Sequence, residues 1–418
     1  MFLKRVRLKN VRCFKDIELD FHEGNGGRKS TVLLGENGTG KSTLLKAIAL
    51  VTGGSDALSD LVGEPDDWLR YGSDLCEIEG VLVTAEGEER RISIVINSGD
   101  SRRDVLIKND KSLELINKAI QHSTRNYFVA GYGASRRLST RRGMQTKTSA
   151  YYSPRAESVA TIFDPEATLN PLESWAMDLD YMEGIKGIDT VRKVLNDFLP
   201  GAAFSHIDKE RGRLMFKTVD GVVPLMFLSD GYQCVSAWIG DLLYRITDTF
   251  EDYRSPLKAR GLLLIDEVDL HLHPTWQRQL ISFLAKKLPN FQIVITTHSP
   301  MTAQQAGPME LHTLHREAGR ISVHQFEGNP RNLLVSQLLM TDVFGLDTDE
   351  SLEVEEKKNR YRKLRDKKDI SKREKTEMKN LTDYLRNLPE PHAERLKVDT
   401  RQVGVLEMVQ KELDARKL

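Results

Sequence analysis

The sequence predicts an α/β protein with antiparallel strands at its N-terminus, an inserted helical lobe and a helical C-terminal appendage. Three observations lead to this fold class. A short apolar strand at 31–34 runs directly into a glycine-rich loop and then a helix. Two aliphatic segments, 262–265 and 293–296, are separated by a helix, which is typical of buried parallel strands. From residue 329 onward the chain is charged and predicted to be helical.

The first hundred residues are predicted to form mostly strands. Apolar and polar residues alternate over 2–21 with a break near 12–16, which predicts two paired strands. Segments 77–84 and 90–96 predict a hairpin. The exception is 42–50, which follows the glycine-rich loop and predicts a helix.

The rest of the head alternates helices and strands. We predict that residues 101–225 form the inserted helical lobe, with an amphipathic helix near 188–198. A helix at 275–287 connects the two parallel strands, and 311–325 predicts a further hairpin. We therefore expect a head over residues 1–330 and a charged helical region over 331–418.

Length and composition fit this division. At 418 residues the chain is longer than a single core usually grows, so one large body with an appendage is expected. Apolar residues make up 39% and charged residues 29%, which is ordinary for a folded protein. The 61 basic and 61 acidic residues balance, so any nucleic-acid binding must depend on local clusters.

The cysteines and apolar segments indicate a cytoplasmic protein with no membrane partner. Cys13, Cys76 and Cys234 lie far apart and form no Cys-x-x-Cys pair, which suits a reducing compartment. No aliphatic stretch approaches the roughly 20 residues that span a bilayer. The N-terminal segment is too basic and too interrupted for a signal peptide.

Residues 35–42 fit the phosphate-binding pattern G-x-x-x-x-G-K-[ST]. Its glycines let the backbone aim N–H groups at phosphates, and the following helix adds the positive end of its dipole. We expect Lys41 to reach the β- and γ-phosphates and Ser42 to bind Mg²⁺ through its hydroxyl. The alternative, a chance glycine-rich turn, is disfavoured by the strand before it and the helix after it. The expected nucleotide-binding residues of this loop are Asn37, Gly38, Thr39, Gly40, Lys41, Ser42 and Thr43.

Two carboxylates follow the strand at 262–265, where α/β sheets hold their ligands. We expect Asp266 to bind Mg²⁺, directly or through water, and Glu267 to act as general base on the attacking water. Taken alone, this motif could also be a solvated acidic turn. The strand at 293–296 leads to His298, which we expect to contact the γ-phosphate and sense its loss. A lone histidine is more often structural.

Residues 228–233 stand directly before an apolar helix at about 233–243. Ser229 is a typical N-cap residue and Gly231 permits close approach, so this segment could present a helix N-terminus to an anion. The alternative is an ordinary capped helix.

Together and in this order, the four motifs resemble those of ABC-type ATPases, specifically the branch with SMC, RecF-like and OLD-family heads. The resemblance covers roughly residues 1 to 330. Residues 35–42 look like Walker A, 228–233 like the signature, 262–267 like Walker B, and His298 like the switch histidine. The resemblance implies an ABC-type P-loop ATPase head whose cofactors are ATP and Mg²⁺.

In that family the signature of one head covers the ATP held by another. The resemblance therefore implies a head-to-head homodimer, or a higher homo-oligomer, in which Ser229 and Gly231 contact the partner's nucleotide. Asp230 and Tyr232 depart from the usual signature, so we expect slow or partner-controlled hydrolysis. No glutamine stands in an obvious Q-loop context, and the candidate segment for that role is 129–136.

Residues 269–274 follow the Walker B-like motif, where the family's D-loop crosses the dimer interface. Its His271 and His273 suggest either an interface contact or a metal pair. We expect the interface role, because no Cys, His or Asp cluster accompanies them.

The C-terminal region separates this chain from two members of the branch. No segment sustains the heptads of SMC arms, and 351–388 predicts only a helical hairpin, with Ser371 and Glu374 as a capping box. No strand-ending acidic constellation of an OLD-type nuclease follows 326, so we do not expect this chain to be a nuclease.

Two basic clusters could contact DNA or RNA. Residues 357–375 hold eleven basic and three acidic side chains. The second cluster consists of Arg136, Arg137, Arg141 and Arg142. The alternative is a solvated helix face.

The whole chain resembles the stand-alone ABC-type ATPases found beside effector nucleases in bacterial anti-phage systems, such as those of Septu and retron modules. This implies an ATPase that dimerises around ATP and scaffolds or regulates an HNH-type nuclease. The alternatives are a RecF-like DNA-repair ATPase that acts directly on DNA, and a slow-turnover, nucleotide-switched scaffold. An import or export ATPase is least favoured, because those usually have an intact signature and membrane partners.

Overall fold

The protein divides into two units, Met1–Gly345 and Leu346–Leu418, in a computed structural model. The sequence had suggested a division at 330. The structure describes residues 1–24, 26–84, 87–122, 127–136, 153–250, 256–367 and 369–388. Within this described part, no helix combines the length and apolar character needed to cross a membrane.

A four-stranded antiparallel sheet in the order β2-β1-β6-β7 forms the N-terminal layer of the first unit. Its strands are β1 (Phe2–Val11), β2 (Phe14–Asp20), β6 (Leu75–Val83) and β7 (Glu89–Asn97). Val6 and Leu8 of β1 are buried at alternate positions, and Leu3 is buried before a register irregularity; the predicted strand pair and the predicted hairpin are confirmed. Two short strands, β3 (His22–Glu23) and β4 (Gly26–Gly27), follow β2.

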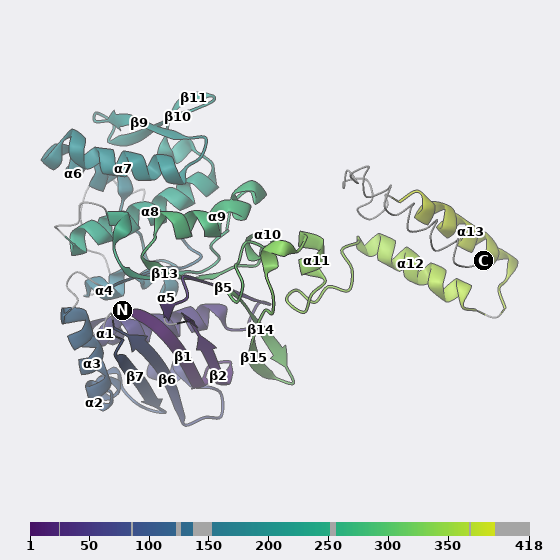
Figure 1. Cartoon of the computed structure of the whole chain (residues 1–418), viewed down its shortest axis with the longest axis horizontal. Helices are drawn as coiled ribbons and strands as arrows, with labels where there is room; N and C mark the ends of the chain where they lie inside the picture. Colours follow the sequence, from purple (N-terminus) through teal and green to yellow (C-terminus); the bar gives the residue numbers. More distant parts are fainter. Residues whose placement is uncertain are drawn as a thin grey trace, which may run out of the picture. The chain divides into compact units, whose positions relative to one another are not determined.

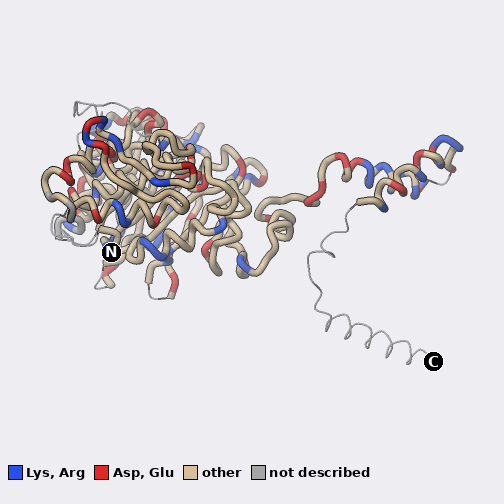
Figure 2. Tube along the Cα trace, turned by 90° about the horizontal axis from the view of Figure 1, so that it is seen from above, with Lys and Arg blue, Asp and Glu red and all other residues tan. Residues whose placement is uncertain are grey.

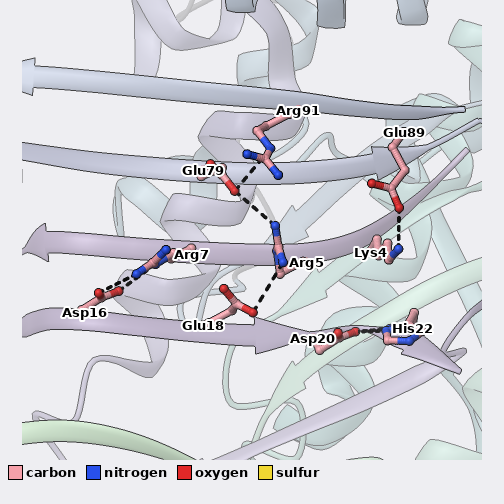
Figure 3. Close-up of polar contacts among 10 residues, drawn as sticks. All are labelled: Lys4, Arg5, Arg7, Asp16, Glu18, Asp20, His22, Glu79, Glu89 and Arg91. Atoms are coloured by element: carbon pink, nitrogen blue, oxygen red, sulfur yellow. Dashed lines mark hydrogen bonds and ion pairs between the residues drawn. The ribbon is translucent and has the colours of Figure 1, made fainter.

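Ion pairs cover the other face of this sheet (Figure 3). Arg7 on the central strand β1 donates two hydrogen bonds, of 2.9 and 2.8 Å, to the Asp16 carboxylate on β2. Arg5 lies between Glu18 on β2 and Glu79 on β6, at 3.6 and 3.5 Å. Acidic residues on both neighbouring strands thus balance the basic residues of β1, and the face presents no one-sided positive charge to a phosphate backbone.

The central sheet has six strands in the order β15-β14-β5-β13-β12-β8. Five of them run parallel and only β15 is antiparallel. The strands are β5 (Ser30–Gly35), β8 (Phe128–Tyr132), β12 (Gly261–Ile265), β13 (Phe291–Thr296), β14 (Leu311–Glu317) and β15 (Arg320–Gln325). The predicted parallel pair and the predicted hairpin at 311–325 are confirmed.

Other elements lie on both sides of this sheet (Figure 1), and its two faces bury separate hydrophobic cores. Leu262 and Leu264 of β12 pack with α1 (Lys41–Leu61) and the N-terminal sheet. Leu263 and Ile265 face the other way, toward α7 (Ile185–Phe198), α8 (Asp230–Thr249) and α9 (Pro274–Lys287). A fully buried parallel strand is apolar on both faces, which explains the continuous aliphatic run.

Helix α1 extends beyond the predicted end at residue 50. It continues to Leu61 across a kink at Gly54, whose φ of 84° and ψ of −177° are not helical. A glycine can end a helix, because it readily adopts a non-helical backbone conformation. Here the chain resumes the helix after the kink.

The segment 101–225 was predicted to be a helical lobe, but it also contains strands. It supplies β8 to the central sheet and forms a three-stranded antiparallel sheet in the order β11-β10-β9. The strands of this small sheet are β9 (Ala203–Asp208), β10 (Arg213–Thr218) and β11 (Gly221–Pro224). Besides α7, the helices are α2 (Arg102–Lys108), α3 (Asp110–His122), α4 (Pro154–Glu157), α5 (Ala160–Phe163) and α6 (Leu172–Glu183). The predicted amphipathic helix near 188–198 is present as α7.

Short helices complete the first unit. They are α10 (Pro300–Ala303), α11 (Val335–Leu339) and the 3-10 turns η1 (Pro65–Trp68), η2 (Leu225–Phe227), η3 (Pro256–Lys258) and η4 (Pro330–Asn332).

The second unit contains α12 (Leu352–Arg365) and α13 (Lys372–Arg386). Ser371 and Glu374 form the predicted capping box. Arg360 on α12 donates two hydrogen bonds, of 2.7 and 2.9 Å, to Glu377 on α13, which confirms the helical hairpin. Basic and acidic residues are mixed along both helices (Figure 2). Five basic residues of the predicted cluster are in ion pairs with acidic neighbours: Lys357, Lys358, Arg360, Arg365 and Lys367.

Candidate functional site

Three of the four predicted motifs meet at one edge of the central sheet. Strands β5, β13, β12 and β8 are neighbours and parallel, so their carboxyl ends lie together. Open α/β sheets bind ligands at this edge. The glycine-rich loop follows β5, the two carboxylates follow β12 and the His298 segment follows β13.

The phosphate loop depends on glycine at two positions. Gly38 and Gly40 have φ values of 79° and 94°, which favour glycine. A Cβ on Gly40 would lie 2.5 Å from the Phe14 ring and 2.6 Å from Cys13 Sγ, so a side chain cannot fit there. The Thr39 hydroxyl donates to the Glu36 carbonyl at 2.8 Å and closes the loop.

Lys41 begins α1 and folds back over this loop. Its Nζ donates to the carbonyl oxygens of Gly35 at 2.7 Å and Glu36 at 3.0 Å. Burial lowers the pKa of Lys41, while the charges of Asp266 and Glu267 raise it. The loop and the acidic end of β12 are therefore close enough to share one electrostatic environment.

Ser42 and Asp266 form a direct contact between the two motifs. Ser42 Oγ donates to Asp266 Oδ2 at 2.5 Å, across 224 residues of sequence. A hydroxyl and a carboxylate oxygen side by side are the hard oxygen ligands that Mg²⁺ prefers. The donor set therefore fits the expected magnesium site.

Thr296, the last residue of β13, orients the acidic pair, and sequence reasoning missed it. Its Oγ1 donates to Asp266 Oδ1 at 2.5 Å and accepts a hydrogen bond from the backbone N–H of Glu267 at 2.8 Å. The register of β12 and β13 pairs Ile265 with Ile295 and so brings Thr296 beside Asp266. A threonine ending the neighbouring strand was the only signal in the sequence.

Glu267 has an unusual backbone. Its φ is 45°, in the left-handed region that non-glycine residues rarely adopt. Its carbonyl accepts a hydrogen bond from Arg136 Nη2. Among the described residues, its carboxylate has no hydrogen-bond partner, so it has free lone pairs that suit the expected general base.

Hydrogen bonds hold the two residues beside His298, while His298 itself is exposed. The Thr297 hydroxyl donates to Asp269 at 2.7 Å, and the Ser299 hydroxyl donates to Gln277 at 2.8 Å. No hydrogen bond joins the His298 ring to another described residue. This anchoring fits a side chain that contacts a ligand.

Ser229 occupies the N-cap position of α8, but its side chain makes no capping hydrogen bond and is exposed. A Cβ on Gly231 would lie 2.8 Å from the carbonyl oxygen of His271, so this glycine permits close packing against the D-loop-like segment. No hydrogen bond between described residues joins Ser229 or Gly231 to the phosphate loop. Within this chain, the structure therefore does not unite these two residues with the other motifs.

Tyr232 and Asp230, the two residues that depart from the usual signature, each have a distinct structural setting. The Tyr232 hydroxyl donates to the Pro200 carbonyl at 2.6 Å, and its ring packs edge-on against Trp276 with centroids 5.0 Å apart. Tyr232 thus anchors the signature helix within the lobe. Asp230 is exposed in the first turn of α8, where a negative charge suits the helix dipole.

The two histidines after Walker B differ in role. His271 is exposed with a φ of 64°, whereas His273 accepts a hydrogen bond from the Thr275 N–H at 3.3 Å and caps α9. Among the described residues, no group of three or more His, Cys, Asp or Glu side chains could hold a metal ion.

Only one member of the second basic cluster can be located. Arg136 is 4% exposed, so its assignment to a surface phosphate-binding cluster is wrong. Its guanidinium turns inward, to the carbonyl of Glu267. Arg137, Arg141 and Arg142 lie outside the described residues.

Two family models match separate parts of the chain. Residues 5–161 match a model described as "AAA domain", and residues 187–302 match one described as "AAA domain, putative AbiEii toxin, Type IV TA system". The matched segments together contain the phosphate loop, the signature, the Walker B-like motif and His298.

Sequence relatives include proteins of two named systems. The chain is 26% identical over 388 residues to "Septu protein PtuA" of Bacillus mycoides, which covers 92% of this chain and 50% of that protein. It is 38% identical over 122 residues to "Retron Ec83 probable ATPase" of Escherichia coli, covering 29% of this chain and 22% of that protein. The chain thus spans half or less of the length of these relatives.

Among solved structures, an SMC head bound to the C-terminal winged-helix domain of ScpA covers 78% of this chain and 98% of its own. The identity is 15% and the TM-score 0.46, which is too low to support a conclusion. The sheet order and motif geometry described above define the fold by themselves. The motifs at the edge of this sheet resemble those of ABC-type ATPases of the SMC-, RecF- and OLD-like branch, and the chain is similar in sequence to AAA-domain models, to a Septu protein and to a probable retron ATPase.

Proposed function

We propose that the chain binds Mg²⁺ and ATP at the carboxyl edge of the central sheet, hydrolyses ATP when two heads dimerise, and regulates a partner nuclease in anti-phage defence. The observation that carries the enzymatic part is the hydrogen-bonded array of Ser42, Asp266 and Thr296 beside the buried Lys41. This array contains the groups that phosphoryl transfer requires: a cation, a magnesium-binding pair and an adjacent carboxylate.

The proposed roles follow from these contacts. Lys41 exchanges its bonds to the loop carbonyls for phosphate oxygens, and the N–H groups of residues 37–43 surround the phosphates. Ser42 and Asp266 hold Mg²⁺, which supplies charge neutralisation at the phosphates when bound. Glu267 accepts a proton from the attacking water at its carboxylate. His298 contacts the γ-phosphate from the adjacent strand end.

Dimerisation would complete the site. Ser229 has an exposed hydroxyl that its own helix does not use, and no hydrogen bond between described residues joins Gly231 to the phosphate loop. In a head-to-head dimer these residues would cover the nucleotide bound by the partner. Asp230 at the same helix end would face that phosphate group, which supports slow or partner-controlled turnover.

The likeness to a Septu protein and a retron ATPase supports a place in anti-phage defence. An HNH-type nuclease partner and a cytoplasmic location are part of this proposal. The alternative of direct action on DNA has less support among the described residues. Four basic side chains of α12 are in ion pairs, Arg136 is buried, and the outer face of the N-terminal sheet is charge-balanced.

The enzymatic part is tested by comparing nucleotide binding and ATP turnover in Lys41→Ala, Glu267→Gln and the wild type. Lys41→Ala should lose nucleotide binding. Glu267→Gln should bind normally while its turnover falls by about 10²- to 10⁴-fold, as expected for removal of a general base. Lys29→Ala, at an exposed lysine outside the site, is the matched control and should behave like the wild type. Undiminished binding in Lys41→Ala, or normal turnover in Glu267→Gln, would contradict the assignments.

The partner is tested by co-expressing the tagged protein with its genomic neighbours and identifying co-eluting chains by mass spectrometry. A stoichiometric nuclease-like chain would support the defence role. A homodimer that elutes alone, binds duplex DNA and is stimulated by it in a salt-sensitive manner would favour the repair alternative.

A further inference from the structure

Arg136 is a buried cation at the end of β8, the fourth strand at the edge of the site. Its side chain is only 4% exposed, and Nη2 donates to the carbonyl oxygen of Glu267. Nε and Nη1 are buried and have no hydrogen-bond partner. Leaving such groups unsatisfied is costly, so a stabilising or functional reason for this arginine is required.

The backbone leading to Arg136 is closely packed. The Asp266 N–H donates to the Tyr132 carbonyl at 2.8 Å, which extends the β8–β12 pairing to the acidic pair. The Gly133 N–H donates to the Thr161 hydroxyl at 3.1 Å. A Cβ on Gly133 would lie 2.0 Å from the Thr161 carbonyl oxygen. Packing therefore determines the direction in which the chain leaves β8. In this direction, the side chain of Arg136 reaches the carbonyl oxygen of Glu267.

Burial and nearby charged groups act on Arg136 in opposite directions. Burial lowers the pKa of Arg136, and the nearby carboxylates of Asp266, Asp269 and Glu267 raise it. Burial also raises the pKa of Cys234 on α8, and the charge of Arg136 lowers it.

Glu267 is held at both ends of its strained backbone. Its N–H is bonded to Thr296 Oγ1 and its carbonyl to Arg136 Nη2. A left-handed non-glycine residue costs free energy and persists only when its neighbours hold it. Two independent elements, β13 and the end of β8, supply those contacts.

We propose that Arg136 is a positioning residue for ATP hydrolysis, which holds Glu267 in its left-handed conformation through the hydrogen bond to its carbonyl oxygen. This inference rests on the proposed ATPase function. The proposal also gives a role to the segment 129–136, which has no Q-loop glutamine. In this segment, Arg136 acts on the proposed general base by donating a hydrogen bond to its backbone carbonyl.

Steady-state kinetics, nucleotide affinity and thermal stability of Arg136→Lys and Arg136→Gln test the proposal. In Arg136→Gln, kcat should fall by about 10- to 100-fold, because a small misplacement of a catalytic group has effects of this size. KM and the Kd for ATP should stay within about threefold of wild type, because the ground-state contacts to phosphate remain. Arg136→Lys should retain more activity than Arg136→Gln, since its ammonium can still donate to the Glu267 carbonyl. Arg278→Gln, at an exposed arginine of α9, is the matched control.

The double variant Arg136→Gln/Glu267→Gln separates positioning from general stabilisation. If Arg136 acts through Glu267, its removal should cause no further loss of turnover in the Glu267→Gln background. Additive losses, wild-type kcat in Arg136→Gln, or loss of folded protein in both single variants would overturn the proposal. A wild-type chain that binds ATP without hydrolysing it would overturn the proposed function as well, whereas normal hydrolysis in the wild type and in Arg136→Gln would overturn only the role of Arg136.

Discussion

Thr296 contributes one hydroxyl to two contacts of the candidate site. It donates to Asp266 and accepts from the N–H of Glu267. Thr296→Val keeps the shape of the side chain but removes both hydrogen bonds. We expect kcat to fall by about tenfold or more, because Asp266 and Glu267 lose their common anchor, with a smaller change in nucleotide Kd.

Thr313→Val is the matched control for this change. Thr313 is also a buried strand residue, on β14, and its hydroxyl donates to the His324 carbonyl at 3.4 Å. Kinetics of both variants distinguish a site effect from the loss of a buried hydroxyl. Equal losses of kcat in the two variants would contradict the role of Thr296.

His312 predicts a pH dependence of stability. Burial, with a contribution from the charge of Arg28, lowers its pKa from 6.5 to about 4. Between these values the unfolded chain binds more protons than the folded chain, so this residue makes stability fall as pH falls from 6.5 toward 4. The full effect is at most about 3 kcal/mol.

Thermal unfolding of the wild type and His312→Gln at pH 7.5 and pH 5 checks this effect. The variant should lose less stability on acidification than the wild type. The neighbouring Glu310 has a raised pKa from burial and acts in the opposite direction, but it is present in both proteins. Identical pH dependence in the two proteins would refute the assignment.

The motif residues could be predicted from sequence because their roles depend on local patterns. Lys41, Ser42 and Asp266 follow strand ends in recognisable spacing, and the structure brings them together. Thr296 and Arg136 could not be assigned in the same way. Their contacts arise from strand neighbours 29 and 131 residues apart, which only the sheet order determines.

At the scale of elements, the packing of β8 against α5 depends on glycine. A Cβ on Gly133 would lie 2.0 Å from a backbone oxygen, which cannot move as a flexible side chain can. We expect Gly133→Ala to destabilise the fold by about 1–3 kcal/mol, as overpacking typically does. Gly26→Ala is the matched control, because the nearest atom to its Cβ would be 4.0 Å away.

Thermal unfolding measures this effect. The melting temperature of Gly133→Ala should fall by several degrees, while that of Gly26→Ala should stay near the wild-type value. An unchanged melting temperature for Gly133→Ala would show that the β8–α5 contact relaxes without cost.

Most elements of the head could be predicted because the spacing of their apolar residues matches which of their faces are buried. The alternating β1 and β2 and the aliphatic β12 and β13 are examples. Strand β8 was missed because it contains Gly131 and is only five residues long. Strands β9, β10 and β11 were also missed, because they form a small sheet whose exposed and buried positions give a weak pattern.

At the scale of the whole molecule, the distribution of functional residues indicates an assembly. The phosphate loop, the acidic pair and Thr296 are joined by hydrogen bonds within one chain, whereas Ser229 is exposed and Gly231 packs against the D-loop-like segment. A site divided in this way supports our proposal that a second head completes it. The central claim is therefore that ATP brings two heads together before hydrolysis.

Light scattering coupled to size-exclusion chromatography of Glu267→Gln, with and without Mg²⁺ and ATP, tests this claim most directly. One chain has a mass of 47.5 kDa. We expect ATP to increase the measured mass by association of heads, and we expect Lys41→Ala or Ser229→Arg in the same background to prevent the increase. A Glu267→Gln protein that binds ATP at full occupancy with no change in mass would contradict the account.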